Sequence, residues 1–361
     1  MYELQQSRPS ERASTNGCEP RSAASGRTSR RHVRPWRRLL IAAASPTPTS
    51  LGLAAAAERL GLAAAIVPPR DLQVLGDRGD VVLGRIDVLP TLDGPQPGLA
   101  ALRRLTDKGV DVVNGSGPLF TAHDKFATAI ALARSGLPHP QTGLIARAER
   151  AHFPPPYVVK PRFGSWGRDV ERCFSEVELA AQLARFGRRR WFRRQGALVQ
   201  ELVPTEGRDL RLVVAGGVVV GAIERVAAPG EWRTNVALGA ERRPTSPPAA
   251  AGALAVAAAS AVGGDLIGVD LLPDGLGGWA VIELNAAVDF NGLYALGKDD
   301  VYETALRAVL AQRSRGNVPA RAVDRPASGN LNAPAVTQRR AGVSSRLASS
   351  GLACVLPGPR A

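Results

Sequence analysis

Three oxygen-bearing side chains interrupt two apolar segments late in the chain. Asp270 lies in IGVDLLP, and Glu283 and Asn285 alternate in VIELN. Because successive residues of a strand point to opposite faces, Glu283 and Asn285 share a face. Carboxylates among apolar strands are unfavourable unless they are paired or bind a metal ion. Three hard oxygen ligands on paired strands favour a Mg²⁺ site that is completed by phosphate and water.

A lysine and a glycine-rich loop form a second candidate, in VVKPRFGSWGRDV (residues 158–170). Lys160 would end a strand and point a fixed cation outward. Residues 164–167 could bring backbone N–H groups close to phosphate oxygens. The same pattern is also typical of an ordinary glycine-rich hairpin turn.

A third candidate is VQELVPTEGRDLRLVV (residues 199–214). Residues 200–203 could offer backbone donors and acceptors to a flat heterocycle. Asp209 and Arg211 are two apart on the next predicted strand, so they face the same side. The alternative for this pair is an exposed salt bridge.

The fourth candidate is EWRTN, with Arg233 and Asn235 on a predicted loop. An arginine can hold a phosphate or a carboxylate through two parallel hydrogen bonds. The alternative is a surface arginine.

The first half of the chain predicts a small parallel α/β unit. Apolar runs that read as strands alternate with helical segments, which is typical of a parallel sheet. We expect strands at 39–44, 64–67 and 110–113, and helices at 51–60 and 98–108. The unit is therefore predicted to occupy residues 36–113.

Residues 114–312 predict a second, two-lobed unit, with lobes at about 114–199 and 200–312. A helix at 122–134 should end at Ser135-Gly136, because Pro138 blocks its continuation. Further helices are expected at 176–186, 249–262 and 301–312. The strands are expected at 157–160, 169–173, 197–202, 209–214, 218–225, 266–272 and 279–285, with a hairpin at Gly216-Gly217.

The net charge of +14 belongs mainly to the two ends of the chain. Residues 1–38 carry a net +6 and residues 311–361 a net +7, so the middle is nearly neutral. Both 1–35 and 313–361 lack apolar periodicity and are predicted to be disordered basic tails. Such tails can bind nucleic acid or another polyanion. The neutral core is not expected to bind nucleic acid.

Other classes of protein are not favoured. Cys18, Cys173 and Cys354 form neither a metal-binding spacing nor a disulfide framework. No apolar run is long enough to span a bilayer, and no signal-peptide core stands at the N-terminus. We expect a cytoplasmic enzyme without membrane contact.

In this order and at these intervals, the four candidates resemble the ATP-grasp superfamily, and within it the RimK-type glutamate ligases and LysX-like ligases. The resemblance covers residues 38–312 and is most specific in HDKFATAIALARSGLPHPQT, VVKPRFGSWGRDV, QELVPTEGRDLRLVV and GVDLLP…VIELN. It implies a mixed α/β fold: a small parallel domain followed by two lobes that hold ATP between them.

The resemblance also implies roles for individual residues. ATP would be bound by Lys125, Lys160, Gly164, Ser165, Trp166, Gly167, Glu201, Leu202, Val203 and Asp209. Mg²⁺, with Mn²⁺ as an alternative, would be bound by Asp270, Glu283 and Asn285. The transferred phosphate and the acyl intermediate would be held by Arg211, Arg233 and Asn235.

The implied reaction is ATP-dependent ligation of a carboxylate to an amine through an acyl phosphate. The family's commonest substrate is glutamate, which would be added to a small-molecule or peptide acceptor, and the family's members form homo-oligomers. Two departures lie near the expected acceptor side. The segment NAAVDF has Ala286-Ala287 where LysX-like enzymes carry a polar residue, and Gly239-Ala240 replaces a double glycine.

Three alternatives remain open. One is a LysX-like ligase that acts on an amino-group carrier protein, and another is a ligase of the glutathione-synthetase kind. The third is a non-catalytic nucleotide-binding module with polyanion-binding tails. The arginine-rich stretch at 185–194 could recruit an acidic partner or form a solvated helix end.

Overall fold

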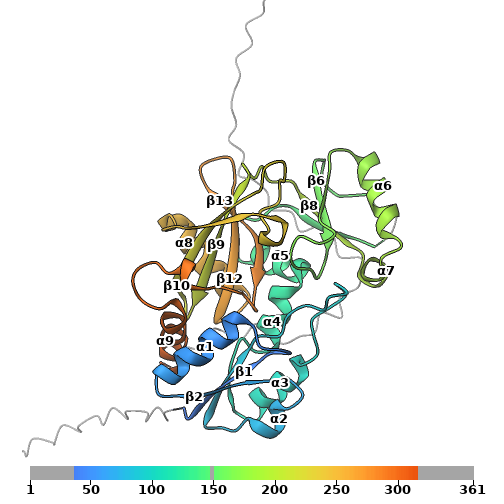
Figure 1. Ribbon diagram of the computed structural model, residues 1–361. Helices are drawn as coiled ribbons and strands as arrows, with labels where there is room; N and C mark the ends of the chain where they lie inside the picture. The colour runs from blue at the N-terminus through green and yellow to red at the C-terminus, as the bar shows by residue number, and fades with distance from the viewer. Residues whose placement is uncertain (1–35, 147–149, 316–361) are drawn as a thin grey trace, which may run out of the picture. The chain divides into compact units, whose positions relative to one another are not determined.

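The computed structural model describes residues 36–146 and 150–315, and contains a parallel sheet and two antiparallel sheets (Figure 1). The predicted tail at 1–35 and residues 316–361 of the predicted tail at 313–361 lie outside the described residues. Residues 313 and 314 of that tail instead belong to a helix, α9 (Val301–Ser314). Within the described part of the chain, no helix is long and apolar enough to cross a membrane.

The N-terminal sheet is four-stranded and parallel, in the order β2-β1-β3-β4. Its first helix begins at Pro48, where a missing N–H costs no hydrogen bond, and the Thr47 side chain caps the amide of Ser50. The predicted parallel sheet is therefore confirmed. Its elements are β1 (Arg38–Ala42), α1 (Pro48–Arg59), β2 (Ala63–Val67), α2 (Leu72–Leu75), β3 (Asp80–Gly84), α3 (Leu99–Asp107) and β4 (Asp111–Val113).

A smaller antiparallel sheet, which we call the small lobe, has the order β5-β8-β6-β7. It has its own apolar core, which includes Tyr157, Leu179 and Trp191. Its elements are β5 (Thr142–Ile145), β6 (Tyr157–Pro161), β7 (Glu171–Cys173), α6 (Glu176–Phe186), α7 (Arg190–Gln195) and β8 (Ala197–Glu201).

The largest sheet is five-stranded and antiparallel, in the order β11-β10-β9-β12-β13. Helix α8 packs with Leu210, Leu212 and Val214 on one face, and α9 packs with Val213 and Ala215 on the other. The elements are β9 (Arg208–Ala215), β10 (Val218–Val226), η1 (Val236–Leu238), β11 (Glu241–Pro244), α8 (Ala249–Ala261), β12 (Leu266–Pro273), β13 (Trp279–Asn285), η2 (Gly292–Tyr294) and α9 (Val301–Ser314).

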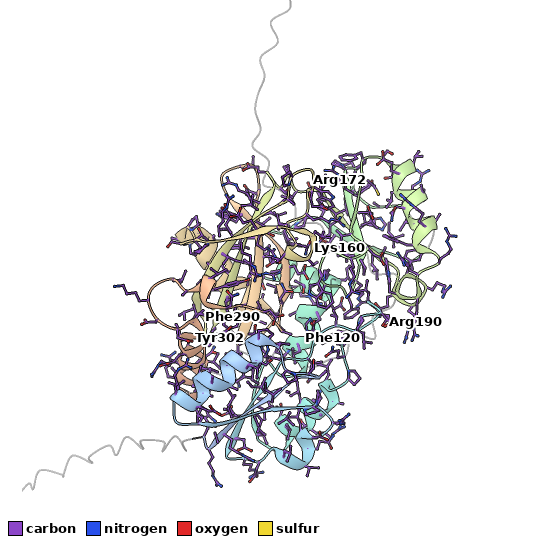
Figure 2. All side chains as sticks on the ribbon, viewed as in Figure 1. Phe120, Lys160, Arg172, Arg190, Phe290 and Tyr302 are labelled. Carbon is purple, nitrogen blue, oxygen red and sulfur yellow. The ribbon has the colours of Figure 1, made fainter. Side chains whose placement is uncertain are left out.

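The N-terminal sheet and the five-stranded sheet share two apolar cores. One of these cores joins Leu39 and Ile41 of β1 to Val309 of α9. The Phe290 and Tyr302 rings lie together in the same region, with centroids 5.1 Å apart (Figure 2). The two sheets are thus parts of one packed unit, whereas the small lobe has a separate core.

The helix expected at 122–134 is instead two helices, α4 (Ser116–His123) and α5 (Lys125–Arg134). They are separated by Asp124, whose extended backbone ends α4. Its carboxylate caps the amides of Phe126 and Ala127 and also accepts hydrogen bonds from Arg162. The local sequence favours helix throughout, but the cap and the ion pair stabilise a break. This break makes Lys125 the first residue of a helix.

Candidate active site

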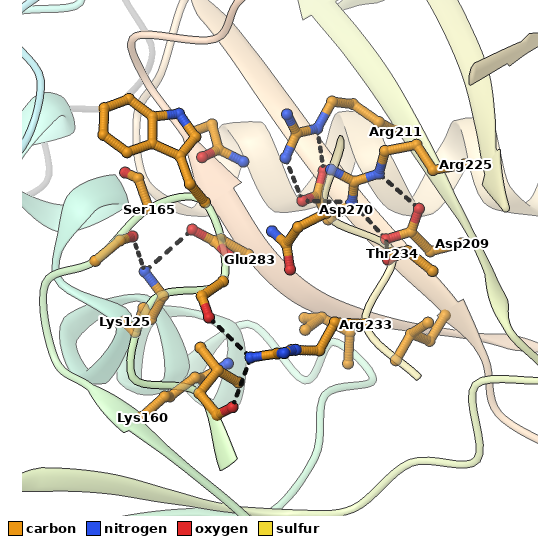
Figure 3. Close-up of a pocket in the computed structure, with 18 of the residues that line it drawn as sticks. Lys125, Lys160, Ser165, Asp209, Arg211, Arg225, Arg233, Thr234, Asp270 and Glu283 are labelled. Carbon is orange, nitrogen blue, oxygen red and sulfur yellow. Dashed lines mark hydrogen bonds and ion pairs between the residues drawn. The ribbon is translucent and has the colours of Figure 1, made fainter. Parts of the chain in front are cut away.

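One cavity of about 490 Å³ brings together all sixteen residues that the sequence predicts for the site. Figure 3 shows part of this cavity, with Lys125, Lys160 and Glu283 among the labelled residues. They come from α5, from β6 and the loop after it, from β8, and from the five-stranded sheet with its loops. Residues more than 150 positions apart in the chain, such as Lys125 and Asn285, therefore line the same cavity.

Two lysines face this cavity and differ in their partners. Lys125 Nζ lies 3.0 Å from Glu283 Oε1 and donates to the Gly164 carbonyl at 2.7 Å. The Lys160 side chain is buried, with the residue only 5% exposed, and its ammonium group makes no ion pair or hydrogen bond with the residues that the structure describes. Burial lowers the pKa of Lys160 to about 8, although the carboxylate of Glu283 opposes this effect. Lys160 is thus a cation without a partner.

The loop of residues 162–170, here called the glycine loop, borders the same cavity. Its backbone takes positive φ values at Trp166, Gly167 and Asp169. Gly167 also approaches Asn235 so closely that an added Cβ would lie 2.7 Å from Asn235 Oδ1. Arg233 Nη1 donates to the carbonyls of Gly167 and Val170, both at 3.1 Å. Lys125 and Arg233 therefore hold the loop from two sides.

Arg233 has a second partner in its own loop. Its Nε and Nη2 donate to the two oxygens of Glu231 at 3.0 and 2.8 Å. A guanidinium group carries five N–H donors, and the four hydrogen bonds to Glu231, Gly167 and Val170 leave one of them for a ligand. Arg233 lines the cavity as expected, but it also connects the glycine loop to residues 231–235.

The strand end at Glu201, Leu202 and Val203 has one free backbone donor. The amides of Glu201 and Leu202 donate to the carbonyls of Gln141 and Pro156, at 2.9 and 3.0 Å. The amide of Val203 makes no hydrogen bond within the described residues. Val203 is therefore the residue of this segment that can donate a backbone hydrogen bond to a heterocycle.

Four charged residues lie on the face of the five-stranded sheet that borders the cavity, and we call them the charged sheet face. Asp209, Arg225 and Asp270 are buried, and Arg211 is partly buried. Arg211 holds both oxygens of Asp270, at 2.7 and 2.6 Å. Arg225 holds both oxygens of Asp209 and also donates to Asp270 Oδ2 at 2.9 Å. Burial opposes ionisation of Asp270, but the two guanidinium groups prevail and keep its pKa well below the usual value.

Two β-bulges determine which residues lie opposite Asp209 and Asp270. Near the turn between β9 and β10, Val219 pairs with Val214, but beyond it Gly221 pairs with Val213. If the register of the turn continued, Glu224 would lie opposite Asp209; the bulge places Arg225 there instead.

The bulge between β12 and β13 acts in the same way. Leu271 pairs with Val281, but Asp270 pairs with Glu283. Without the shift, Ile282 would lie opposite Asp270 and Glu283 would point to the other face.

By themselves, the predicted metal ligands supply only part of the coordination shell of Mg²⁺. The described residues contain no cluster of three or more His, Cys, Asp or Glu side chains that could hold a metal ion. Asp270 and Glu283 nevertheless lie opposite each other, and the buried Nδ2 of Asn285 has no hydrogen-bond partner in the described structure. Mg²⁺ usually takes one or two carboxylates and completes its shell with water and phosphate. The donor set fits an ion that arrives with a nucleotide.

Sequence reasoning missed Arg225 and Thr234, which complete the charged sheet face. Thr234 Oγ1 donates to Asp209 Oδ2 at 2.6 Å, and both side chains are buried. The available signal was a charged residue near the end of an apolar strand in VVVGAIERV. The sequence does not show the bulge between β9 and β10. Without the bulge, Arg225 cannot be assigned as the neighbour of Asp209.

Three of the six arginines in the stretch at 185–194 form ion pairs within the protein. Arg190 and Arg194 both contact the buried carboxylate of Asp93, at 2.9 and 3.1 Å, and Arg189 pairs with Asp169. These contacts fix α7 against the segment around Asp93. Arg185, Arg188 and Arg193 are exposed and make no ion pair within the described residues.

Comparison with known proteins identifies relatives of this chain. The RimK-like ATP-grasp domain model matches residues 122–307. The tetrahydromethanopterin:alpha-L-glutamate ligase of Methanosarcina acetivorans is 31% identical over 54% of this chain and 65% of its own length. The glutamate–LysW ligase ArgX of Sulfurisphaera tokodaii is 31% identical over 51% of this chain and 67% of its own length. The chain thus spans about two thirds of these relatives.

Solved structures have the same fold. A RimK domain ATP-grasp protein from Sphaerobacter thermophilus superposes with a TM-score of 0.54, at 22% identity, over 76% of this chain and 99% of its own. The ATP-grasp ligase PsnB, solved with a precursor variant, Mg and ADP, superposes with a TM-score of 0.54 at 18% identity, over 77% and 99% of the two chains. With the family model and these relatives, the chain belongs to the RimK-like ATP-grasp family.

Proposed function

We propose that this protein is an ATP- and Mg²⁺-dependent ligase that joins a carboxylate to an amine through an acyl phosphate. The observation that carries the proposal is the ion pair between Lys125 and Glu283. It places a cation expected at the phosphates beside a carboxylate expected at the metal ion. A site of this composition suits the meeting of a nucleotide and a second anion.

The chemistry follows from the charges. The carboxylate oxygen attacks the γ-phosphorus of ATP, so the bond to the ADP oxygen breaks and an acyl phosphate forms. The amine then attacks the carbonyl carbon, loses a proton, and expels inorganic phosphate as the amide forms. Two anions must approach each other in the first step, and the Lys160 and Lys125 ammonium groups lower the repulsion between them.

Other residues of the chain have supporting roles. Asp270, Glu283 and Asn285 would hold Mg²⁺, which supplies further positive charge at the phosphate oxygens. The glycine loop, held by Lys125 and Arg233, would keep water away from the acyl phosphate. Arg211, Arg233 and Asn235 would hold the transferred phosphate, and Val203 would bind the adenine edge.

For the substrates we propose glutamate or another amino acid and a small-molecule or peptide acceptor. The two relatives are both named as glutamate ligases, one acting on tetrahydromethanopterin and one on LysW. A carrier protein is therefore the alternative acceptor. We also propose a homo-oligomer that acts in the cytoplasm and accepts Mn²⁺ in place of Mg²⁺.

The test is phosphate release from ATP and Mg²⁺, screened across amino acids and acceptors, with Glu283→Ala beside the wild type. We expect release that needs both an amino acid and an acceptor and that is absent in the variant. Parallel assays with Mn²⁺ test the choice of metal. The proposal is wrong if the wild type binds ATP tightly and no pair of substrates stimulates release.

A further inference from the structure

Residues 286–290, which we call the post-strand segment, carry the chain out of the five-stranded sheet along the cavity. The segment begins directly after Asn285, which is the last residue of β13 and a predicted metal ligand. Its residues Ala287, Val288 and Asp289 line the cavity. Because the segment lies outside the sheet, its carbonyls need hydrogen-bond partners other than a neighbouring strand.

The N-terminal sheet supplies these partners from its carboxyl end. Arg85 directly follows β3, and Asn114 directly follows β4. Arg85 Nη1 donates to the Val288 carbonyl at 2.8 Å, and its Nη2 donates to the Ala287 carbonyl at 3.4 Å. Asn114 Nδ2 donates to the Ala286 carbonyl at 3.1 Å. Side chains of a different sheet therefore hold three successive carbonyls of the segment.

The far end of the post-strand segment is fixed as well. Thr49, in the first turn of α1, donates from its hydroxyl to the Phe290 carbonyl and accepts from the Phe290 amide, both at 3.1 Å. The Tyr302 hydroxyl of α9 donates to the same carbonyl at 2.9 Å. The segment is thus held at both ends and in the middle.

The post-strand segment also folds back over β12 beside the predicted metal ligands. An added Cβ at Gly268 would lie 2.5 Å from Val288 Cγ2 and 3.4 Å from Asn285 Cβ, so Val288 can take this position only against a glycine. Gly268 is also the residue of β12 that pairs with Asn285. Val288 and Asn285 meet over one glycine, which links the position of the segment to that of the Asn285 side chain.

Arg85 makes more contacts with the segment than any of the other side chains that hold it. Its side chain is 3% exposed, and its Nη2 lies 3.0 Å from Asp289 Oδ1 in addition to the two carbonyl contacts. A guanidinium group carries its donors in a fixed planar arrangement, so it constrains direction as well as distance. A lysine presents its donors from a single nitrogen atom and cannot reproduce this arrangement.

We propose that Arg85 is a positioning residue for the Mg²⁺ site, because it fixes the post-strand segment and thereby the Asn285 side chain. The inference rests on the proposed function for the presence of the metal site. Groups that hold metal ligands in place from behind contribute strongly to metal affinity. Arg85 should therefore affect binding of a nucleotide with Mg²⁺ more than binding of the nucleotide without it.

Calorimetry on the full chain measures binding of AMPPNP, a non-hydrolysable ATP analogue, in Mg²⁺ and in EDTA. We expect Mg²⁺ to tighten binding to the wild type. Arg85→Met should bind AMPPNP about 10-fold more weakly than wild type in Mg²⁺, and as wild type does in EDTA. Arg85→Lys keeps the charge without the planar arrangement, so it should lose part of the gain from Mg²⁺.

Arg38→Met is the matched control for a loss of stability in the same sheet. Arg38 holds the buried carboxylate of Asp80 at the opposite, amino end of β1 and β3, with Nη2 2.7 Å from Asp80 Oδ2. Both Arg38→Met and Arg85→Met should lower the Tm. Only Arg85→Met should lose affinity for AMPPNP in Mg²⁺.

The inference is overturned if Arg85→Met keeps the gain from Mg²⁺, if it loses affinity equally in EDTA, or if Arg38→Met loses the gain to the same extent. Should Arg85→Met not fold, an unchanged gain in Arg85→Lys overturns it. A wild type that does not respond to Mg²⁺ contradicts both the inference and the metal assignment of the proposed function. Because no turnover is needed, an inactive protein with the expected pattern would contradict the proposed ligase and support the role of Arg85.

Discussion

The charged sheet face and the small-lobe side of the cavity handle charge in opposite ways. On the sheet, Asp209, Arg225, Asp270 and Arg211 neutralise one another through short hydrogen bonds. On the small lobe, Lys160 is almost fully buried without a carboxylate in hydrogen-bonding contact. The first region pairs its charges with one another, and the second contains a charge without such a partner.

The difference separates two kinds of contribution to a site. A closed network of buried ion pairs holds its members in one geometry, although it contributes little net stability over an apolar equivalent. An unpaired buried cation destabilises the free protein and is relieved when an anion binds. We infer that the sheet supplies the geometry of the site, and that Lys160 supplies affinity for phosphate.

The largest expected effect comes from opening the closed network. Arg225→Met removes the cation that holds Asp209 and leaves a buried carboxylate with Thr234 as its remaining side-chain partner. We expect a loss of about 3 to 5 kcal/mol in the free energy of unfolding, measured with urea. Arg243→Met, on an exposed side chain, should cause no measurable change. If Arg225→Met lost less than about 1 kcal/mol in the free energy of unfolding, the charged sheet face would not be a closed network of buried ion pairs.

Removing the unpaired cation of Lys160 should instead raise the free energy of unfolding. The pKa of Lys160 falls from 10.5 to about 8 on folding, so below pH 8 the buried charge is present and its full penalty acts on the folded state. Lys160→Met should therefore be more stable than wild type at pH 7, by about 3 kcal/mol. As the pH rises above 8, Lys160 of the folded wild type loses its charge. The difference in the free energy of unfolding between Lys160→Met and wild type should then become smaller.

Urea unfolding of both proteins between pH 7 and 9.5 measures this gap. The same variant should bind ATP about tenfold more weakly at pH 7, because the phosphate loses a cation. If the variant is less stable than wild type at pH 7, or if the gap does not depend on pH, Lys160 is not an unpaired buried charge.

The smallest of these effects concerns the glycine loop. Gly167→Ala must accept φ near +70° and a Cβ 2.7 Å from Asn235 Oδ1. We expect the free energy of unfolding to fall by about 1 to 3 kcal/mol, which is measured as a lower Tm. Gly297→Ala is the control, because a Cβ there meets no atom within 4 Å and its φ is not positive. Equal shifts in the two variants would show that the loop is not held in one conformation.

Much of the fold and the site could be predicted from local patterns. The alternation of strands and helices predicts the parallel sheet, because it depends on residues near one another in the chain. The hairpin between β9 and β10 follows from Gly216 and Gly217, which both take positive φ. All sixteen predicted site residues do line one cavity, although their individual roles stay predictions.

The tertiary structure alone decided the rest. The β9–β10 bulge chooses Arg225 over Glu224 as the partner of Asp209, and the β12–β13 bulge chooses Glu283 over Ile282 as the neighbour of Asp270. A strand alternates its faces with a period of two, so a single extra residue reverses which side chains point inward. The amino-acid sequence therefore determined which chemical groups were available, and long-range pairing determined which of them meet.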